Sequence, residues 1–502
     1  MMIKYTHRDI RSYYQELVEN ALHYLADKEI DKCVSNIEVS SYLQYNYNYI
    51  YTDDVVEQII KKISDLLLVT DNSVCDDNII VWYDSFSWDN RGLTQQYIDA
   101  LSVLDNKKFV YVSEGGIDGR GNDIKASLQG YGNCIDIVEI KGDIETKVRT
   151  LYKIILKYKP AKFLLHSTPW AIAPIVVLYS FPQIKLYQIN ITDHAFWVGS
   201  KRVDYSVEFR KYGFTVSREK RGIDINKLIF LPYYPWHKDT AFNGFPIDTQ
   251  GKVVLFSGGS IYKIVGEDNF FFFLIRDILF ANENAIFLFA GEGNTEWLKK
   301  LIVENNLGNR FILLGTRTDI CEVFKRCDIY IGTYPFPGGL MSQYAALYKK
   351  PILAYKNFQT DSVEDLICTK KYEPFSFSNR TDLINEAKKL ISDNNYRLER
   401  GEFFSSLVLL QPEFRKKFKA LVIEESHVDN KEYCDFPQID YNAFNESYLD
   451  RLNQNVTSRE LERRLFRAFG VNLFRGSIRK WKIIYNVFPC IWNKILHRCK
   501  II

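Results

Sequence analysis

The chain has 502 residues, of which 46% are hydrophobic and 25% are charged, so it can build ordinary cores and is not wholly disordered. Its 65 basic and 62 acidic residues give a net charge of +3, which by itself indicates no partner. Nine scattered cysteines without a C-x-x-C pair argue against a zinc site and a disulfide framework, and favour reduced cysteines in the cytosol. The sequence predicts neither a secretory signal nor a run of about 18–20 apolar residues that spans a membrane.

Residues 1–75 are predicted to form a helical N-terminal region. Apolar residues recur at three- and four-residue spacing within Ile10–Leu25 and again within Val55–Leu67, as on amphipathic helices. The stretch Tyr42–Tyr51 between them is irregular and rich in Tyr and Asn. We expect this region either to mediate oligomerisation or to contact an acceptor.

Two series of short β-rich runs follow, each alternating with helical patterns. The first series, within 78–240, has strand candidates at 79–83, 109–112, 135–138, 163–165 and 184–189. The second, within 248–425, has them at 253–256, 286–289, 311–314, 328–331 and 351–354. A Pro-rich segment, 231–246, separates the two. This alternation predicts an α/β chain with two Rossmann-like domains, followed by C-terminal helices and a basic tail in 426–502.

The strongest candidate site is a strand-to-helix turn in the second series. Gly338 and Gly339 allow close approach of the backbone, and the helix that begins there presents unpaired N–H groups, which suits a phosphate. Leu340 lies in its first turn, and the Ser342 hydroxyl adds a further hydrogen-bonding group. The alternative is a tight turn without a ligand.

A second glycine loop follows the first strand of the same series. Gly258 and Gly259 precede Lys263, an arrangement that suits an anion held between backbone amides and one cation. The spacing is not that of a P-loop or of a G-x-G-x-x-G fingerprint. The alternative is a flexible loop with a solvated lysine.

The first series offers two histidines that directly follow strands. His194 stands next to Asp193, and such a pair can orient an imidazole that takes a proton from a hydroxyl group. The alternative is that His194 packs under Trp197 as a structural residue. His166 ends the preceding strand and competes for the same role.

A Gly-rich loop after the second strand of the first series carries Glu114 and Asp118. Carboxylates in such a loop suit a ligand with many hydroxyl groups. A solvated turn is the equal alternative.

Together these motifs resemble GT-B glycosyltransferases over 78–425, and residues 250–360 resemble the donor half of the bacterial family 4 (group 1) type. The matching pieces are the loop with Gly258, Gly259 and Lys263, then Phe289–Gly293, Leu314–Ile320, Cys327–Tyr330, and the Gly-Gly helix start before Lys350-Pro351. The resemblance implies a fold of two Rossmann-like domains and a nucleotide-sugar donor.

The resemblance also implies roles for individual residues. The donor would be bound by Gly258, Gly259, Lys263, Gly315, Arg317, Gly338, Gly339, Leu340, Ser342 and Gln343. Acceptor chemistry would fall to His194 and Asp193, with His166, Glu114 and Asp118 on the acceptor side.

One departure from the family concerns two glutamates. Family 4 enzymes carry two Glu separated by seven residues, where this chain has Phe336 and Tyr344, and Gln343 is the candidate substitute. No D-x-D motif lies in a suitable loop, so we expect no metal and no cofactor beyond the nucleotide-sugar substrate.

The C-terminal tail, Arg463–Ile502, holds ten Lys/Arg and no Asp/Glu, which leaves residues 1–462 with a net charge of −7. Its cations are interleaved with Phe and Trp, a pattern typical of segments that lie in a membrane interface. Docking on the acidic body is the alternative, and nucleic-acid contact is the least favoured.

The sequence thus predicts a glycosyltransferase that moves a sugar from a nucleotide-sugar to a glycan or lipid-linked oligosaccharide in bacterial capsule, O-antigen or related polysaccharide synthesis. We expect it in the cytoplasm, at the inner face of the plasma membrane. Two alternatives stay open: an inactive GT-B subunit that binds glycan or a partner enzyme, and an enzyme similar to nucleotide-sugar 2-epimerases.

Overall fold

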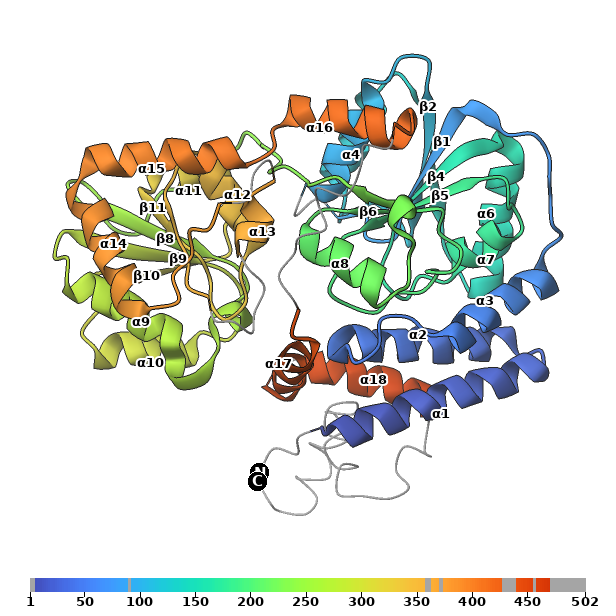
Figure 1. The fold of residues 1–502 in the computed structure, drawn as a ribbon, viewed down its shortest axis with the longest axis horizontal. Coiled ribbons are helices and arrows are strands. Elements are labelled where there is room, and N and C mark those ends of the chain that lie inside the picture. Colours follow the sequence, from blue (N-terminus) through green and yellow to red (C-terminus); the bar gives the residue numbers. More distant parts are fainter. Residues whose placement is uncertain are drawn as a thin grey trace. The chain divides into compact units, whose positions relative to one another are not determined.

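The computed structural model describes residues 5–88, 92–356, 363–369, 373–426, 439–454 and 457–469. The chain forms two compact units (Figure 1). Of the described residues, those within 5–88, 97–230 and 421–469 belong to the first unit, and those within 92–96 and 231–420 belong to the second.

The first unit contains a seven-stranded parallel sheet of order β3-β2-β1-β4-β5-β6-β7. Its strands are β1 (Asp76–Asp84), β2 (Lys108–Glu114), β3 (Cys134–Ile140), β4 (Pro160–His166), β5 (Lys185–Asn190), β6 (Tyr205–Glu208) and β7 (Leu228–Phe230). Strands β1 to β4 contain the predicted runs, and β5 covers the run predicted at 184–189 except for Ile184. The short strands β6 and β7 add to them.

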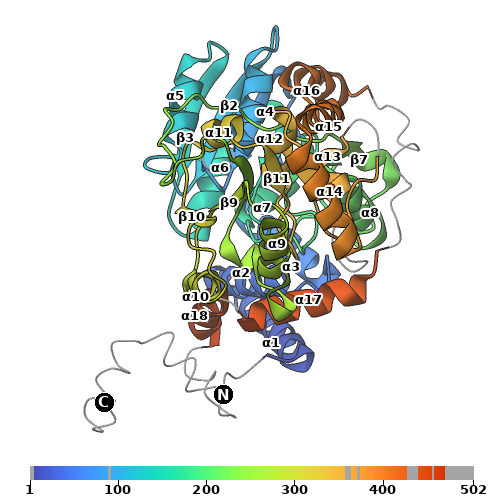
Figure 2. The same cartoon turned by 90° about the vertical axis from the view of Figure 1, so that its left-hand side faces the viewer.

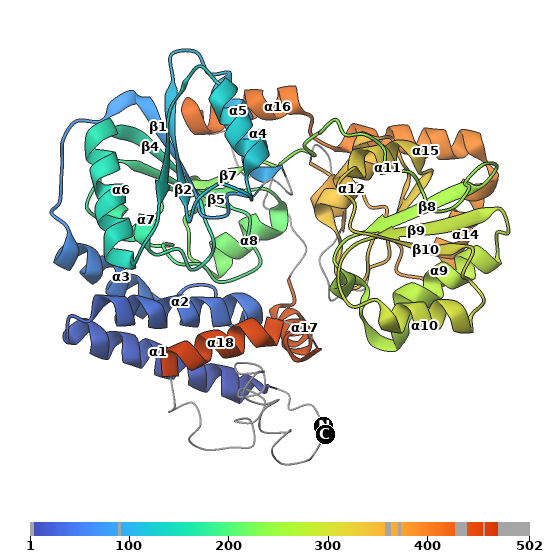
Figure 3. The same cartoon turned by 180° about the vertical axis from the view of Figure 1, so that it is seen from behind.

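Helices of the first unit fall into two groups. Those that alternate with the strands are α4 (Leu93–Ser102, which begins in the second unit), α5 (Asn122–Gly130), α6 (Ile144–Tyr158), α7 (Ala173–Tyr179) and α8 (Lys211–Glu219). A helical layer combines both ends of the described chain: α1 (His7–Ala26), α2 (Ile30–Tyr47), α3 (Asp54–Leu67), α17 (Tyr441–Gln454) and α18 (Thr457–Phe469). Figure 3 shows α1, α2 and α18 side by side.

Helix α2 extends to Tyr47, so the expectation that Tyr42–Tyr51 is irregular is wrong over its first half. α2 contacts α1, α6, α17 and α18, and most of its residues are buried. A helix that is buried on several faces lacks the polar face that makes an amphipathic pattern visible in a sequence.

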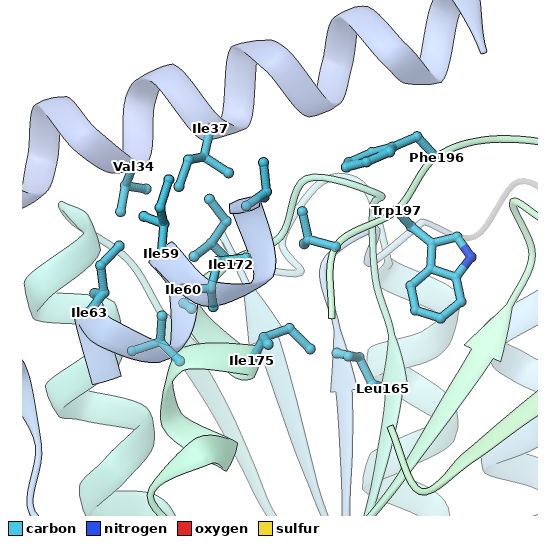
Figure 4. Packing of buried hydrophobic residues seen from close by; sticks show 14 of the residues in the cluster. Val34, Ile37, Ile59, Ile60, Ile63, Leu165, Ile172, Ile175, Phe196 and Trp197 are labelled. Atoms are coloured by element: carbon cyan, nitrogen blue, oxygen red, sulfur yellow. The ribbon is translucent and has the colours of Figure 1, made fainter. Parts of the chain in front are cut away.

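The helical layer shares one hydrophobic core with the sheet. Val34 and Ile37 of α2 point toward Ile59 and Ile60 of α3, and these in turn lie against α7 (Figure 4). Because this core is continuous with the sheet, the layer is part of the first unit.

The second unit contains a five-stranded parallel sheet of order β10-β9-β8-β11-β12. Its strands are β8 (Val253–Gly258), β9 (Ala285–Ala290), β10 (Phe311–Gly315), β11 (Ile329–Ile331) and β12 (Ile352–Leu353). Its helices are α9 (Phe270–Phe280), α10 (Glu296–Glu304), α11 (Ile320–Arg326), α12 (Gly339–Leu347), α13 (Val363–Ile367), α14 (Arg380–Ser392), α15 (Asn394–Leu407) and α16 (Gln411–Phe418).

Alternate residues of the second sheet fill two cores. Leu255 and Phe287 face α9 and α14, which lie side by side in Figure 2. Phe256 and Leu288 face α11 and α12 on the other side of the sheet. Successive side chains of a strand point to opposite faces of the sheet, and here both faces are covered. Nearly every residue of such a strand is therefore apolar, which explains why these strands could be predicted from the sequence. The prediction of an α/β chain with two Rossmann-like domains is confirmed.

A buried carboxyl group joins the helical layer to the first sheet. Glu57 on α3 is 3% exposed and accepts a hydrogen bond of 2.7 Å from the Gly199 backbone N–H, which follows β5. Burial raises the pKa of Glu57 to about 7, although backbone hydrogen bonds from the loop act in the opposite direction.

We predict a pH dependence of stability from Glu57. The unfolded chain releases this proton near the ordinary pKa of 4.5, whereas the folded chain keeps it up to about pH 7. The free energy of unfolding therefore falls as the pH rises through this interval, by about 3 kcal/mol in all. Denaturant unfolding at pH 4.5 and pH 8 should show that the free energy of unfolding of Glu57→Gln lacks this decrease. Equal falls in the two proteins would contradict the prediction.

Candidate functional site

The loops that follow β8 and β9 are pressed together at the carboxyl edge of the second sheet. The backbone N–H of Gly259 donates to the Ala290 carbonyl at 2.9 Å, and Gly259 has φ +145°. A Cβ atom on Gly291 would lie 1.9 Å from the Gly259 carbonyl oxygen. One on Gly258 would lie 2.6 Å from the methyl end of Met341, on α12. The glycines that the sequence singled out thus let three segments approach closely.

Lys263 joins this loop to the beginning of α12. Its ammonium group lies 3.3 Å from the Pro337 carbonyl oxygen, and its own carbonyl accepts a hydrogen bond of 3.3 Å from the Phe336 N–H. The cap residue of α12 is Gly338, and no side-chain hydrogen bond caps this helix among the described residues. A cation and the first N–H groups of an uncapped helix therefore meet at one place, which is the physical requirement of an anion site.

Two other predicted donor residues, Ser342 and Gln343, are on α12 and make hydrogen bonds within the protein. The Ser342 hydroxyl is buried and donates to the Gly338 carbonyl at 3.0 Å. The Gln343 side chain is buried and donates to the Leu366 carbonyl at 2.9 Å. Leu340 is half-buried in the first turn of α12. In this structure Ser342 thus bonds within the first turn of its own helix, whereas Gln343 ties α12 to α13.

Arg317 also makes contacts within the protein. Its guanidinium donates to both Asp319 carboxylate oxygens, at 2.7 and 2.6 Å, and to the Gly244 carbonyl at 2.7 Å. Burial raises the pKa of Asp319, but the hydrogen bonds from Arg317 and from the backbone outweigh it and hold the pKa below its usual value. Gly315 ends β10 with φ +66°, and its carbonyl accepts a hydrogen bond from Gly291 at 2.9 Å.

Phe336 and Tyr344, at the positions where family 4 enzymes carry glutamates, offer no carboxylate. The Tyr344 hydroxyl donates to the Trp236 carbonyl at 2.6 Å, and burial raises the pKa of Tyr344 well above its usual value. The Phe336 ring lies 6.1 Å from that of Tyr262. Tyr344 thus joins α12 to the segment before β8.

Sequence reasoning did not identify Glu364, a buried carboxylate at the beginning of α13. It accepts hydrogen bonds from the Lys356 ammonium at 3.1 Å and from the Ser376 N–H at 2.9 Å. Its partners lie 8 and 12 residues away along the chain, so no short motif reveals the cluster.

In the first unit, Asp193 is fixed by a buried ion pair. Arg210, which precedes α8, donates to the Asp193 carboxylate at 2.9 Å, and both side chains are at most 5% exposed. Burial raises the pKa of Asp193, but the charge and hydrogen bonds of Arg210 and His194 outweigh it, so the pKa lies well below its usual value. Asp193 is therefore an ionised hydrogen-bond acceptor.

His194 lies against this carboxylate. Its Nδ1 atom is 3.4 Å from an Asp193 oxygen, and its side chain is 23% exposed. An ionised carboxylate can only accept, so the neutral imidazole carries its proton on Nδ1, which leaves Nε2 as the basic nitrogen. The Asn48 side chain donates to the His194 backbone carbonyl, so α2 helps to hold the loop. Trp197 is buried under the Arg221 guanidinium, 5.2 Å away.

A second buried carboxylate supports the same loop. Both Glu208 oxygens accept from the Asn190 amide, at 3.0 and 2.9 Å, and burial raises the pKa of Glu208. Arg221 donates to the Asp193 carbonyl at 2.7 Å. A Cβ atom on Gly213 would lie 2.6 Å from the Asp193 Cβ, so α8 packs directly on this network. Only scattered polar residues mark this network in the sequence.

His166, the other candidate, is buried. Its Nδ1 atom lies 3.2 Å from Asp84, whose carboxylate also accepts from the Tyr111 hydroxyl at 2.9 Å. The His166 side chain is only 3% exposed, compared with 23% for His194. A substrate hydroxyl can therefore reach His194 more readily.

The two acidic residues of the Gly-rich loop are both paired with lysines. Glu114 accepts from Lys147 at 2.8 Å and from the Tyr83 hydroxyl at 2.8 Å. Asp118 is 72% exposed and lies 2.7 Å from Lys125, whose hydrogen bond lowers the pKa of Asp118.

The basic tail is described only up to Phe469. Within that part, the Arg464 guanidinium lies 4.1 Å from the ring centre of Tyr42, so this part of α18 docks on α2. The rest of Arg463–Ile502, on which the membrane prediction depends, lies outside the described residues. Within the described part of the chain, no helix is long and apolar enough to span a membrane.

A scan against models of protein families finds no match, and a search of curated proteins finds none either. Among solved structures, the chain is similar to an O-GlcNAc transferase variant of Thermobaculum terrenum, with 14% identity, 89% of this chain and 81% of that chain covered, and a TM-score of 0.49. It is also similar to Anabaena HepE in complex with UDP and glucose (14% identity; 69% and 97% covered; TM-score 0.48). A third structure is UDP-GlcNAc 2-epimerase of Neisseria meningitidis bound to UDP-GlcNAc (12% identity; 70% and 100% covered; TM-score 0.47).

We predict that Gly291→Ala disrupts the paired glycine loops. The added Cβ would collide with the backbone of Gly259, so we expect a loss of about 1–3 kcal/mol in the free energy of unfolding. Gly308→Ala is the matched control, because a Cβ there meets no atom within 4 Å. Denaturant unfolding of the three proteins tests this, and a Gly291→Ala protein as stable as Gly308→Ala would contradict it.

Proposed function

We propose that this protein is a glycosyltransferase that moves a sugar from a nucleotide-sugar donor to a glycan or lipid-linked oligosaccharide. The observation that carries the proposal is the uncapped beginning of α12 beside the Lys263 ammonium and the glycine loops of β8 and β9. A diphosphate fits such a place, because backbone N–H groups, a helix dipole and a cation all favour negative charge.

In the proposed reaction, the bond between the anomeric carbon of the sugar and the diphosphate oxygen breaks. The nucleoside diphosphate leaves with the bonding electrons, and its new charge develops next to Lys263 and the first N–H groups of α12. Donors fixed before the reaction stabilise such charge most effectively. We propose that these protein groups suffice without a metal ion, so chelators should leave activity unchanged.

On the acceptor side, the hydroxyl oxygen of the acceptor forms the new bond to the anomeric carbon, and its proton passes to His194 Nε2. Asp193 is a positioning residue in this scheme, because Arg210 occupies its carboxylate and its low pKa keeps it ionised. His194 is the better candidate base than His166 because its side chain is more exposed.

The acceptor that we propose belongs to bacterial surface polysaccharide synthesis, such as a capsule or an O-antigen. The chain would then act in the cytoplasm, with the basic tail at the inner face of the plasma membrane. The support is the concentration of cations and aromatic residues in Arg463–Ile502.

One observation favours a second candidate, a subunit that binds a nucleotide-sugar or glycan without turnover. Phe336 and Tyr344 stand where family 4 enzymes carry glutamates, and the Tyr344 hydroxyl is engaged with the Trp236 carbonyl. Binding without transfer would favour this candidate.

We predict that Lys263→Ala weakens nucleotide binding. UDP, GDP, ADP, CMP and dTDP would be tested by thermal shift, and a ligand at 100 times its Kd should stabilise the wild type by about 2.7 kcal/mol. A hydrogen bond to a charged group contributes about 1.5–3 kcal/mol, so Lys263→Ala should raise the Kd at least tenfold. Lys299→Ala, at a lysine of α10 that is 58% exposed, should bind like the wild type.

Sugar transfer, measured beside the nucleotide shift, separates the two candidates. For a transferase, the wild type transfers sugar, and His194→Ala should abolish transfer and leave the nucleotide shift intact. A binding subunit should show the nucleotide shift in both proteins and transfer in neither. A wild type that is stabilised by none of the nucleotides would overturn the donor site itself.

A further inference from the structure

Helix α2 presents a stripe of three residues to the carboxyl edge of the first sheet. Glu38, Tyr42 and Tyr45 are spaced four and three residues apart, so they share one face of the helix. The rings of Tyr42 and Tyr45 lie edge-on to Trp170, at 4.9 and 5.5 Å, in the loop after β4. The Tyr45 ring also lies 6.1 Å from that of His194, in the loop after β5.

Only part of this stripe belongs to the core. Tyr42 is buried in the same hydrophobic core as Val34 and Ile37, which pack against α3 and α7 (Figure 4), and Trp170 packs against that core. Tyr45, Trp170 and His194 instead stay half-buried, so part of each side chain remains accessible.

Polar groups surround the rings. The Arg464 guanidinium of α18 lies 5.2 Å from the Trp170 ring centre. At the other end of the stripe, Glu38 interacts with the ion pair of Glu114 and Lys147, and burial raises its pKa to about 7. Aromatic rings bordered by a few fixed polar groups are the usual composition of a site that binds a partly apolar ligand with many hydroxyl groups.

We propose that Tyr45, Trp170 and His194 form a carbohydrate subsite in which the acceptor sugar stacks on the aromatic rings beside the imidazole. The proposal rests on the proposed function, because it assigns the acceptor side of the same reaction. It gives the helical layer a role: α2 supplies Tyr45, and α18 places the Arg464 guanidinium 5.2 Å from the Trp170 ring centre.

The test uses the full chain labelled with 5-fluorotryptophan and followed by fluorine NMR. The chain has eight Trp, and the Trp170 resonance is assigned with Trp170→Phe. Maltohexaose, cellohexaose and chitohexaose are the probes. We expect at least one of them to move the Trp170 resonance in a saturable way. If none of the three does so, the proposal is overturned.

Variants of tyrosine residues provide the matched controls. Tyr45→Ala should raise the Kd of the active probe about tenfold, and Tyr45→Phe should restore binding, because stacking needs the ring. Tyr24 is a half-buried tyrosine of the same helical layer, and its ring lies next to the Lys32 ammonium at the start of α2. Tyr24→Ala should bind the active probe with the Kd of the wild type. Equal Kd values for Tyr45→Ala and Tyr24→Ala would also overturn the proposal.

The nucleotide assay on the same samples distinguishes this proposal from the proposed function. Tyr45→Ala should leave the nucleotide shift unchanged, because the donor residues lie in the second unit. Probe binding at Trp170 without any nucleotide shift would retain the carbohydrate subsite and remove the transferase. A nucleotide shift without probe binding would retain the donor site of the proposed transferase and overturn the carbohydrate subsite.

Discussion

All pairs of neighbouring strands in the two sheets are parallel, so every loop that follows a strand emerges at the same edge of its sheet. This constraint brings Gly259, Gly291 and Gly338 together in the second unit, although nearly 80 residues separate the first from the last. It also places His166 and His194 at one edge in the first unit. The candidate chemistry of each unit depends on this single geometric fact.

Buried charge pairs then decide which polar residues of these loops are available to a ligand. Asp193 is neutralised by Arg210, and Arg317 by Asp319. Removing one partner of such a pair leaves an uncompensated buried charge, which costs about 3–5 kcal/mol. These residues therefore fix loop conformation. The candidates for chemistry next to them are the partly exposed His194 side chain and the first N–H groups of α12, which no side chain caps among the described residues.

The sequence predicted the fold well because the strands are continuous apolar runs and most helices have one polar face. It failed for the end of α2, where burial on several faces hides the period of the helix. Within the candidate site, the glycines after β8 and before α12 could be predicted from the strand–turn–helix pattern. The partners of Gln343 and Glu57 could not, because Leu366 and Gly199 lie 23 and 142 residues away along the chain.

The helical layer shows why a site in this chain cannot be read from the sheet alone. Asn48 holds the backbone of His194, and Glu57 holds Gly199 a few residues further on, so two helices that precede the first strand fix the loop after the fifth. An imidazole that takes up a proton must be oriented as well as basic. Asp193 supplies the orientation within the loop, and the N-terminal helices fix where that loop lies. A change in the helical layer that leaves both sheets intact should therefore act first on the loop that carries Asp193 and His194.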